Sequence, residues 1–340
     1  MQTIIVNGYA YPNIRPALLT AAGPHLSYLS MFTYGLTPEG GLIPLEDGVL
    51  IETVRPYAVG PLMVLTAMNA EGGFDNQMAH AVFQDAARSA RLLDEVEETI
   101  RRKGLAGIDF DFEYLLPEDA AAYADLIRRA AERLNPQGAI VLVAAAPKTY
   151  AGQPGLLYEA HDYPKLGAAA NLILLMTYEW GYTYGPPMAV APLTQVRRVL
   201  DYGVQEIPRE KILMGIPNYG YDWTLPFVPG ESRAEKVSNP EAAARALRTG
   251  AAVQWDEAAQ TPWYTYTDGA GRMHEVWFEN EASLRAKLNL VAEYDLAGVS
   301  YWNLMEPMIG NWGVQESLYL PAKQLKFADP DAMQTGAAAR

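Results

Sequence analysis

Cysteine is absent from the 340 residues, and histidine occurs only four times. Without cysteine the chain forms no disulfide, carries no thiolate nucleophile and builds no zinc site of the cysteine type. The histidines are His25, His80, His161 and His274. No two of them have the spacing of metal ligands on one helix, so the sequence predicts neither a metal ion nor another cofactor.

Basic residues are scarce as well, with 26 Lys and Arg against 40 Asp and Glu and a net charge of -14. Because no long basic run is present to follow a phosphate backbone, nucleic acid is not an expected partner. No apolar stretch reaches the roughly 18 residues needed to span a bilayer, and we expect no membrane partner. The first residues, MQTIIVNGYAYPN, lack the charged start and long apolar run of a secretory signal, which argues against secretory export.

Hydrophobic residues make up 50% of the chain, enough for a large core. Short, β-branched apolar runs alternate along the sequence with Ala-rich, charged segments of helical periodicity. The apolar runs are 3–9, 28–35, 61–68, 104–114, 139–147, 171–179, 211–220 and 296–305. The clearest helical intervals are 76–102, 118–134, 192–202 and 281–294.

Eight strand and helix units in alternation predict an α/β fold, a (β/α)8 TIM barrel over residues 1–326. An open doubly wound sheet would have about six strands and a glycine-rich first turn, and no G-x-G-x-x-G follows the first run. Between the seventh and eighth runs, residues 224–276 contain a short helix, strand-like pieces and a DGAG hairpin signal. This interval predicts a small α+β insertion. Residues 327–340 lack periodicity, and we expect a flexible tail there.

The stretch GLAGIDFDFEYL, residues 104–115, places Asp109, Asp111 and Glu113 at alternate positions. Alternation with period two indicates a strand with two different faces. On an ordinary amphipathic strand the acids would face water. In a barrel they would line the interior and climb towards the C-terminal mouth, where barrel enzymes have their active sites. Because close, buried carboxylates cannot all ionise together, one of them should stay protonated near neutral pH and act as a general acid.

Four ordered segments resemble motifs of glycoside hydrolase family 18, the family of chitinases and endo-N-acetylglucosaminidases. GIDFDFE resembles the D-x-D-x-E signature of the fourth strand, and LLMTYEW resembles the Met-x-Tyr motif of the sixth. MGIPNYGYDW resembles the seventh-strand segment, and GVSYWNL resembles the eighth-strand segment with its tryptophan. The longer stretch YEWGYTYGPPMAVAPLTQVRRVLDYGV resembles the branch of bacterial spore enzymes that degrade cortex peptidoglycan.

The resemblance implies retention of anomeric configuration with the substrate's own 2-acetamido carbonyl as nucleophile, an exception to the usual two-carboxylate scheme. Glu113 would protonate the glycosidic oxygen and later activate water. Asp111 would hold the acetamido N–H and stabilise the oxazolinium, and Asp109 would share a proton with it. Tyr178 would donate a hydrogen bond to the acetamido carbonyl, and Trp302 would form the apolar floor under the distorted sugar.

Further candidate substrate-binding residues follow from the same segments. They are Met176, Glu179, Trp180, Tyr219 and Asp222. Trp180 forms an aromatic cluster with Tyr182 and Tyr184 that either stacks on sugar faces or pins a loop by packing. For Tyr219 and Asp222, packing between helix and strand is an equal alternative.

Two positions depart from the family pattern. An acid usually stands three residues before the first aspartate of the run, and this chain has Ala106 there, so Asp109 lacks one possible partner. Many chitinases have aspartate after the tyrosine of the sixth-strand motif, and this chain has Glu179. We expect Glu179 to keep a polar role near the acetamido group.

The leading hypothesis is a glycosidase that cleaves β-1,4 bonds after N-acetylglucosamine in peptidoglycan, in particular modified spore cortex, with chitin oligosaccharides as the alternative substrate. A sugar-binding lectin on the same barrel is a second hypothesis, but such lectins typically replace the acid found here as Glu113. A third is a Mg²⁺ or Ca²⁺ enzyme, yet acids two residues apart on one strand lie about 6.6 to 7 Å apart, too far to converge on one ion unaided.

The expected location follows from the start of the sequence and from the resemblance together. A spore enzyme without a secretory signal would be made in the mother cell and deposited in the coat or cortex; otherwise the chain would be cytoplasmic. We expect it to act as a monomer.

Overall fold

The computed structural model describes residues 2–69, 71–308 and 310–323; the predicted tail at 327–340 lies outside the described residues. Parallel strands close into a barrel in the order β1-β14-β8-β7-β6-β5-β4-β2, with β2 paired back to β1. These strands are β1 (Gln2–Ala10), β2 (Tyr28–Leu36), β4 (Gly60–Leu65), β5 (Gly107–Phe110), β6 (Ile140–Ala145), β7 (Leu172–Leu175), β8 (Ile212–Pro217) and β14 (Gly298–Trp302). Each overlaps one of the predicted apolar runs, which confirms the (β/α)8 barrel.

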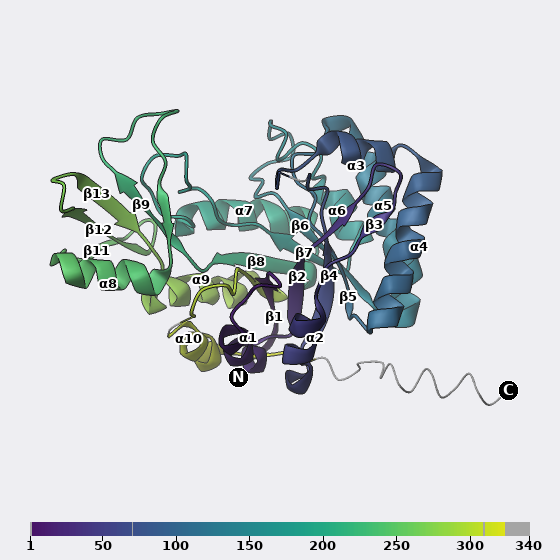
Figure 1. Cartoon of the computed structure of the whole chain (residues 1–340), viewed down its shortest axis with the longest axis horizontal. Coiled ribbons are helices and arrows are strands. Elements are labelled where there is room, and N and C mark those ends of the chain that lie inside the picture. Colours follow the sequence, from purple (N-terminus) through teal and green to yellow (C-terminus); the bar gives the residue numbers. More distant parts are fainter. Residues whose placement is uncertain (1, 70, 309, 324–340) are drawn as a thin grey trace.

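Helices surround the barrel (Figure 1). They are α1 (Pro16–Ala22), α2 (Gly48–Val54), α3 (Asn76–Phe83), α4 (Ala86–Lys103), α5 (Ala120–Leu134), α6 (Tyr163–Ala169), α7 (Leu193–Glu206), α9 (Glu281–Tyr294) and α10 (Asn311–Leu318). The predicted helical interval 76–102 holds two helices, because Asp85 ends the first and caps the second. Its side chain accepts hydrogen bonds from the backbone N–H groups of Ala87 and Arg88.

Short elements complete the barrel layer. Strand β3 (Leu42–Ile43) pairs with β2, and β15 (Tyr319–Pro321) pairs with β1. Single 3-10 turns lie at Gly23–His25, Arg55–Tyr57, Pro117–Asp119, Asn135–Gln137 and Arg209–Lys211. Among the described residues, every helix is too short or too polar to cross a membrane.

The two faces of β5 and the residues that follow it are packed differently, as the alternation predicts. Phe110 and Phe112 are fully buried, and the ring of Phe112 lies 5.4 Å from Phe83 on α3 and 5.6 Å from Tyr123 on α5. The phenylalanines therefore face the helices, which leaves the inward face to Asp109 and the acids after it.

The barrel interior beside this inward face is polar. The Asn7 side chain on β1 donates hydrogen bonds to the hydroxyls of Ser30 on β2 and Ser300 on β14, each at 3.0 Å. Because these buried groups bond one another, their burial avoids most of the desolvation cost. Asp109 joins this network from β5, as described below.

Gly107 allows β5 to approach β6 closely at the start of the acid run. Its φ is 156°, and a Cβ there would collide with the carbonyl oxygen of Ile140. Only glycine fits such a backbone at that separation. The glycine that precedes the acids in the sequence is therefore a packing requirement of the barrel.

Between β8 and β14 the chain forms a second, antiparallel sheet with one helix. Its strands are β9 (Gly220–Thr224), β10 (Glu235–Val237), β11 (Gln254–Asp256), β12 (Thr261–Thr267) and β13 (Met273–Trp277), and its helix is α8 (Asn239–Thr249). The sheet order is β10-β9-β13-β12-β11. The insertion therefore starts at Gly220, four residues before the predicted limit of 224. The reason is that β9 pairs with β13 from Tyr221 to Thr224.

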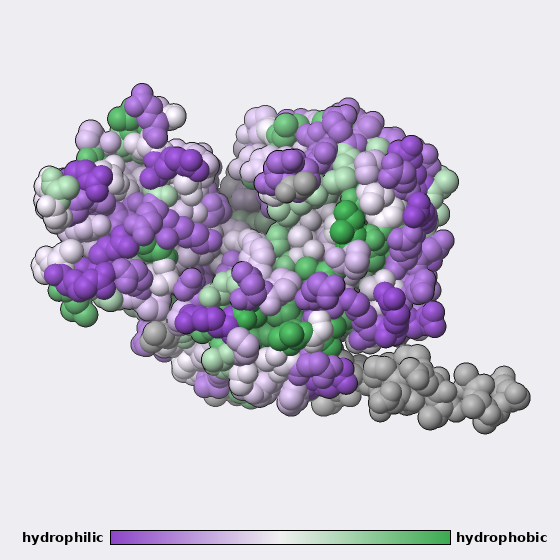
Figure 2. All heavy atoms as spheres, in the orientation of Figure 1, coloured by the Kyte–Doolittle hydropathy of each residue, from purple (hydrophilic) through white to green (hydrophobic). Residues whose placement is uncertain are grey.

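The insertion lies at one end of the long axis of the molecule, and α4 lies at the other (Figure 1). In the space-filling view a notch separates the insertion from the barrel (Figure 2). Hydrogen bonds join the insertion to the loop after β7. Among them, Ala234 N–H donates to the Thr183 carbonyl at 2.7 Å, and the Trp223 indole N–H donates to the Gly185 carbonyl at 2.8 Å. This loop therefore bridges the barrel and the insertion.

Candidate active site

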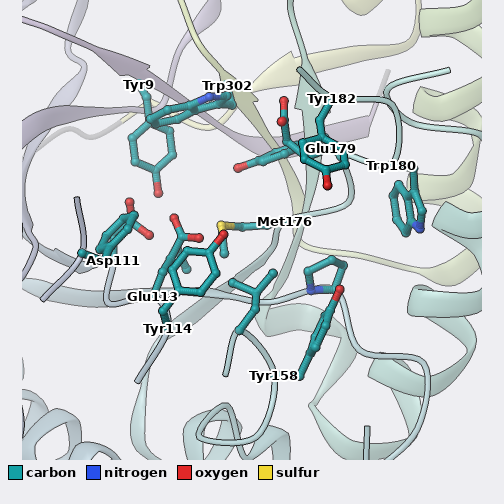
Figure 3. Close-up of a pocket in the computed structure, with 15 residues that line it drawn as sticks. Tyr9, Asp111, Glu113, Tyr114, Tyr158, Met176, Glu179, Trp180, Tyr182 and Trp302 are labelled. Atoms are coloured by element: carbon teal, nitrogen blue, oxygen red, sulfur yellow. The ribbon is translucent and has the colours of Figure 1, made fainter. Parts of the chain in front are cut away.

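A cavity of about 480 Å³ opens at the C-terminal ends of the barrel strands (Figure 3). It is lined by Tyr9, Phe74, Asp111, Glu113, Tyr114, Ala144, Pro147, Leu157, Tyr158, Met176, Tyr178, Glu179, Trp180, Tyr182 and Trp302. Its polar atoms come mainly from carboxyl groups and phenols, and aromatic rings supply most of its walls. A volume of this size suits a small ligand or one part of a longer chain.

The three acids of the run stand at successive depths. Strand β5 ends at Phe110, so only Asp109 belongs to the sheet, and it is 0% exposed. Asp111 is 4% exposed and lines the cavity floor, and Glu113 lines the cavity above it. Figure 3 shows the carboxyl groups of Asp111 and Glu113 directed towards the same space. The structure thus brings these two together in the cavity and keeps Asp109 beneath it.

Asp109 is tied to the polar network of the barrel interior. The Ser30 hydroxyl donates to Asp109 Oδ2 at 2.7 Å, whereas Asp109 Oδ1 has no hydrogen-bond partner among the described residues. Burial raises the pKa of Asp109 to about 6, and the Tyr9 hydroxyl and then the bond from Ser30 act in the opposite direction.

Asp111 and Glu113 influence each other's ionisation. Burial, followed by the negative charges of Glu113 and Asp109, raises the pKa of Asp111 well above its usual range. Burial and then the charge of Glu179 raise the pKa of Glu113 to about 7. Because these groups cannot all be charged at once, the cavity retains protons near neutral pH. Glu113 lines the cavity and is more exposed than Asp111, so of these two it is the better placed to pass its proton to a ligand.

Tyr178 and Trp302 line the same cavity as Asp111 and Glu113. Burial, with the nearby charges of Asp111 and Glu113, raises the pKa of Tyr178 well above its usual range, so its hydroxyl remains a hydrogen-bond donor. The Trp302 ring lies 5.1 Å from Tyr9 and 5.3 Å from Phe32, both edge to face. These contacts hold the indole at the cavity wall.

Glu179 extends the acidic side of the cavity. Its backbone is left-handed, with φ of 68°, and its carboxylate accepts hydrogen bonds from Tyr219 and from Tyr221, the latter at 3.2 Å. Burial raises the pKa of Glu179, while the Tyr219 bond and the nearby Lys236 cation act in the opposite direction. Tyr219 is therefore held behind Glu179 and does not itself line the cavity. Met176 and Trp180, both predicted as substrate-binding residues, line it.

Asp222 does not reach the cavity, contrary to its prediction as a binding residue. Side chains alternate along β9, so Tyr221 faces Glu179 and Asp222 faces the insertion. There its carboxylate pairs with Arg245, accepts from the Tyr266 hydroxyl at 2.7 Å and bonds His274 Nδ1 at 2.7 Å. Asp222 thus stabilises the insertion.

Several cavity residues were not predicted as site residues. They are Tyr9, Phe74, Tyr114, Ala144, Pro147, Leu157 and Tyr158. Tyr9 and Ala144 lie near the ends of β1 and β6, where the barrel rule alone would have found them. Tyr114 and Pro147 stand at the ends of the predicted runs 104–114 and 139–147, and the others lie on loops. Of the predicted aromatic cluster, Tyr182 lines the cavity, whereas Tyr184 lies under Arg233, 5.1 Å from its guanidinium.

Within residues 2–69, 71–308 and 310–323, no group of three or more His, Asp or Glu side chains is arranged to hold a metal ion. The acids of the run take up positions at different depths. In these positions the acids can exchange protons with a ligand and form hydrogen bonds to it.

Comparison with known proteins agrees with this geometry. The sequence profile "Glycosyl hydrolases family 18" matches residues 67–306. The chain belongs to glycosyl hydrolase family 18. This family 18 chain is 40% identical over 291 residues to the cortical fragment-lytic enzyme of Bacillus subtilis (strain 168), which covers 86% of this chain and 67% of that protein.

Two solved structures are similar over nearly the whole family 18 chain. The spore cortex-lytic enzyme SleL of Bacillus cereus has a TM-score of 0.92 and 33% identity, covering 96% of this chain and 76% of that chain. SleL of Bacillus megaterium QM B1551 has a TM-score of 0.90 and 36% identity, covering 95% and 76%. The protein is a glycosidase of family 18 related to spore cortex-lytic enzymes.

Proposed function

We propose that the protein cleaves β-1,4 bonds after N-acetylglucosamine in peptidoglycan, with retention of configuration and with the substrate's acetamido group as nucleophile. The observation that carries this proposal is the placement of Glu113 above Asp111 in one cavity, with Tyr178 and Trp302 lining it too. In this family 18 chain the cavity thus combines a proton donor, Glu113, with a second carboxyl group, Asp111, and a phenol, Tyr178.

In the first step, protonated Glu113 gives its proton to the glycosidic oxygen as the acetamido carbonyl oxygen attacks the anomeric carbon. The bond to the leaving sugar breaks, the leaving sugar departs as an alcohol, and an oxazolinium ion forms. Asp111 holds the acetamido N–H and balances the positive charge, and Tyr178 donates to the carbonyl oxygen. In the second step, ionised Glu113 takes a proton from a water molecule. The water oxygen attacks the anomeric carbon from the face that the leaving sugar occupied and opens the oxazolinium, so the configuration is retained.

The substrate and location are proposed from the relatives. Proteins 33 to 40% identical to this chain carry names that refer to the spore cortex or its fragments. We place the action of this chain at the peptidoglycan of the spore cortex, where it works as a monomer. The cavity presents carboxyl groups and aromatic faces, which suit a neutral, acetylated sugar.

The test uses a disaccharide thiazoline, a stable mimic of the cyclised intermediate. Because the site should stabilise that intermediate more than the substrate, the thiazoline should inhibit at least about a hundredfold more strongly than the parent disaccharide. Equal inhibition, together with a fluorosugar trapped on Asp109, Asp111 or Glu113, would identify the ordinary retaining mechanism and overturn the proposal.

A further inference from the structure

His161 is a buried histidine that none of the steps above uses. It lies in the segment between β6 and α6, is 1% exposed and does not line the cavity. The backbone N–H of Ala146 donates to His161 Nδ1 at 2.7 Å. On the opposite side of the ring, His161 Nε2 lies 2.9 Å from the carbonyl oxygen of Phe112.

The two partners of His161 decide its tautomer. An N–H group only donates, so Nδ1 carries no proton, and a carbonyl only accepts, so Nε2 carries one. A second proton on Nδ1 would face the Ala146 N–H and break that bond. Burial also lowers the pKa of His161 to about 4. The ring therefore stays neutral and serves as a fixed bridge between two backbone groups.

The carbonyl that His161 holds belongs to the peptide unit whose nitrogen is that of Glu113. A peptide unit is planar and rigid, so fixing the Phe112 oxygen restrains the position of the Glu113 Cα, from which the side chain departs. This support matters because β5 has already ended at Phe110. Directly after Glu113, Tyr114 adopts a left-handed backbone with φ of 55°.

His161 is itself held by two residues. Lys148 Nζ donates to the His161 carbonyl at 2.9 Å, and the His161 N–H donates to the Tyr158 carbonyl at 3.1 Å. Lys148 is 3% exposed, and Tyr158 lines the cavity. The backbone before Glu113 and the loop that carries Tyr158 are therefore connected through His161, the first by its ring and the second by its backbone N–H.

We propose that His161 is a positioning residue that aims Glu113 by donating its Nε2–H to the Phe112 carbonyl. The proposal rests on the function above, in which Glu113 is the general acid. His161 does not touch substrate and transfers no proton. Its contribution is to keep the acid within hydrogen-bond reach of the glycosidic oxygen.

Two substitutions separate the two hydrogen bonds of the ring. Glutamine places its amide nitrogen near the position of Nε2, so His161→Gln keeps the donor to Phe112. Asparagine places its amide oxygen near Nδ1, so His161→Asn keeps the bond from Ala146 and loses the donor. His80→Asn, which removes a partly exposed ring bound to Asp119 outside the cavity, is the matched control.

His161→Asn should lower kcat by about ten- to a hundredfold with KM changed by less than about threefold, because a misaimed group slows the chemical step more than binding. His161→Gln should recover most of the loss, and His80→Asn should leave kcat unchanged. Equal losses in both His161 variants, or normal kcat in His161→Asn, would overturn the proposal.

Nitrogen NMR of the imidazole in the unmodified protein supplies a measurement that needs no variant. It should show a neutral Nε2–H ring from pH 5 to pH 9, and a ring that titrates there or carries its proton on Nδ1 would contradict the proposal. Glu113→Gln is assayed in parallel. Normal turnover in that variant overturns the proposed function itself, whereas normal turnover in His161→Asn alone overturns only the positioning role.

Discussion

At the scale of single residues, four carboxyl groups share one region, and their surroundings determine which of them gives up a proton to a ligand. They are Asp109, Asp111, Glu113 and Glu179. Asp109 is bonded to Ser30 and closed off from the cavity, and Glu179 is bonded by two phenols. Asp111 and Glu113 direct their carboxyl groups into the same space, and Glu113 is the more exposed of the two.

Glu113→Gln keeps the size and hydrogen bonding of this side chain but removes the proton that it transfers. We expect kcat on peptidoglycan fragments to fall by at least about a hundredfold. Affinity for an N-acetylglucosamine oligomer, measured by calorimetry, should change little, because the amide fills the same space. Glu118→Gln, at an exposed position nearby, is the control and should have normal kcat. Near-normal turnover in Glu113→Gln would mean that another group is the acid.

The two aspartates below Glu113 should differ in their effects on the pH profile. Asp111→Asn removes the anion beside the acetamido group and also the like charge next to Glu113. The pKa of Glu113 should then fall, so the basic limb of kcat/KM against pH moves to lower pH while the rate drops strongly. Asp109→Asn should cost less, since its amide can still bond Ser30. A larger loss in Asp109→Asn, with an unshifted profile in Asp111→Asn, would reverse the two roles.

Part of this site could be predicted from the sequence and part could not. Three acids at period two share one face of a strand. The sequence therefore predicted that Asp109, Asp111 and Glu113 would all point into the barrel. Tyr158 and His161 were not, because their segment has no periodicity and their roles depend on contacts with residues far away in the chain. A lone histidine in a sequence gives no sign of which carbonyl it will meet.

At the scale of elements, alternation along β9 explains the wrong prediction for Asp222. Tyr219, Tyr221 and Trp223 share one face by period two, and their rings lie 5.8 Å and 5.7 Å apart in sequence order. Asp222 must then face the other way, into the insertion. The pattern NYGYDW contains this information, but only once β9 is known to be a strand of the second sheet.

Asp222→Ala should destabilise the insertion strongly, because it leaves Arg245 and His274 buried without their shared carboxylate. We expect a loss of about 3 to 5 kcal/mol in the free energy of unfolding, measured with urea. Glu235→Gln removes a partner of the same Arg245 from an exposed position and should cost less than about 1 kcal/mol. Similar small losses in both variants would show that the buried network contributes little.

At the scale of the whole molecule, the barrel was predictable because each strand is a short apolar run between helical segments. The residues at which its strands and the insertion begin and end were harder to predict from the sequence. The run 104–114 predicted a long strand, whereas β5 stops at Phe110 because the chain leaves the sheet to form the cavity. The insertion starts at Gly220, where only the pairing with β13 marks the change of sheet.

The free energy of unfolding should depend on pH through Glu113, the residue proposed as the general acid. Because the pKa of Glu113 is raised from 4.5 to about 7, its contribution to stability is full below pH 4.5 and is lost as pH rises through 7. Relative to the unmodified protein, Glu113→Gln should therefore gain about 1 to 3 kcal/mol between pH 4.5 and pH 8. The pKa of His161 is lowered to about 4, so its contribution to the free energy of unfolding changes with pH in the opposite direction. Because His161 is present in both proteins, this contribution cancels when the variant is compared with the unmodified protein. A difference that does not change with pH would contradict the raised pKa.

The most direct test of the account is digestion of purified spore cortex, with mass spectrometry of the new reducing ends. Vegetative peptidoglycan and chitin oligosaccharides serve as comparison substrates, and Glu113→Gln serves as the inactive control. The account predicts that the unmodified protein releases cortex fragments that end in reducing N-acetylglucosamine and that the variant releases none. Fragments that end in muramic residues, or cleavage of chitin oligosaccharides with the cortex left intact, would contradict it.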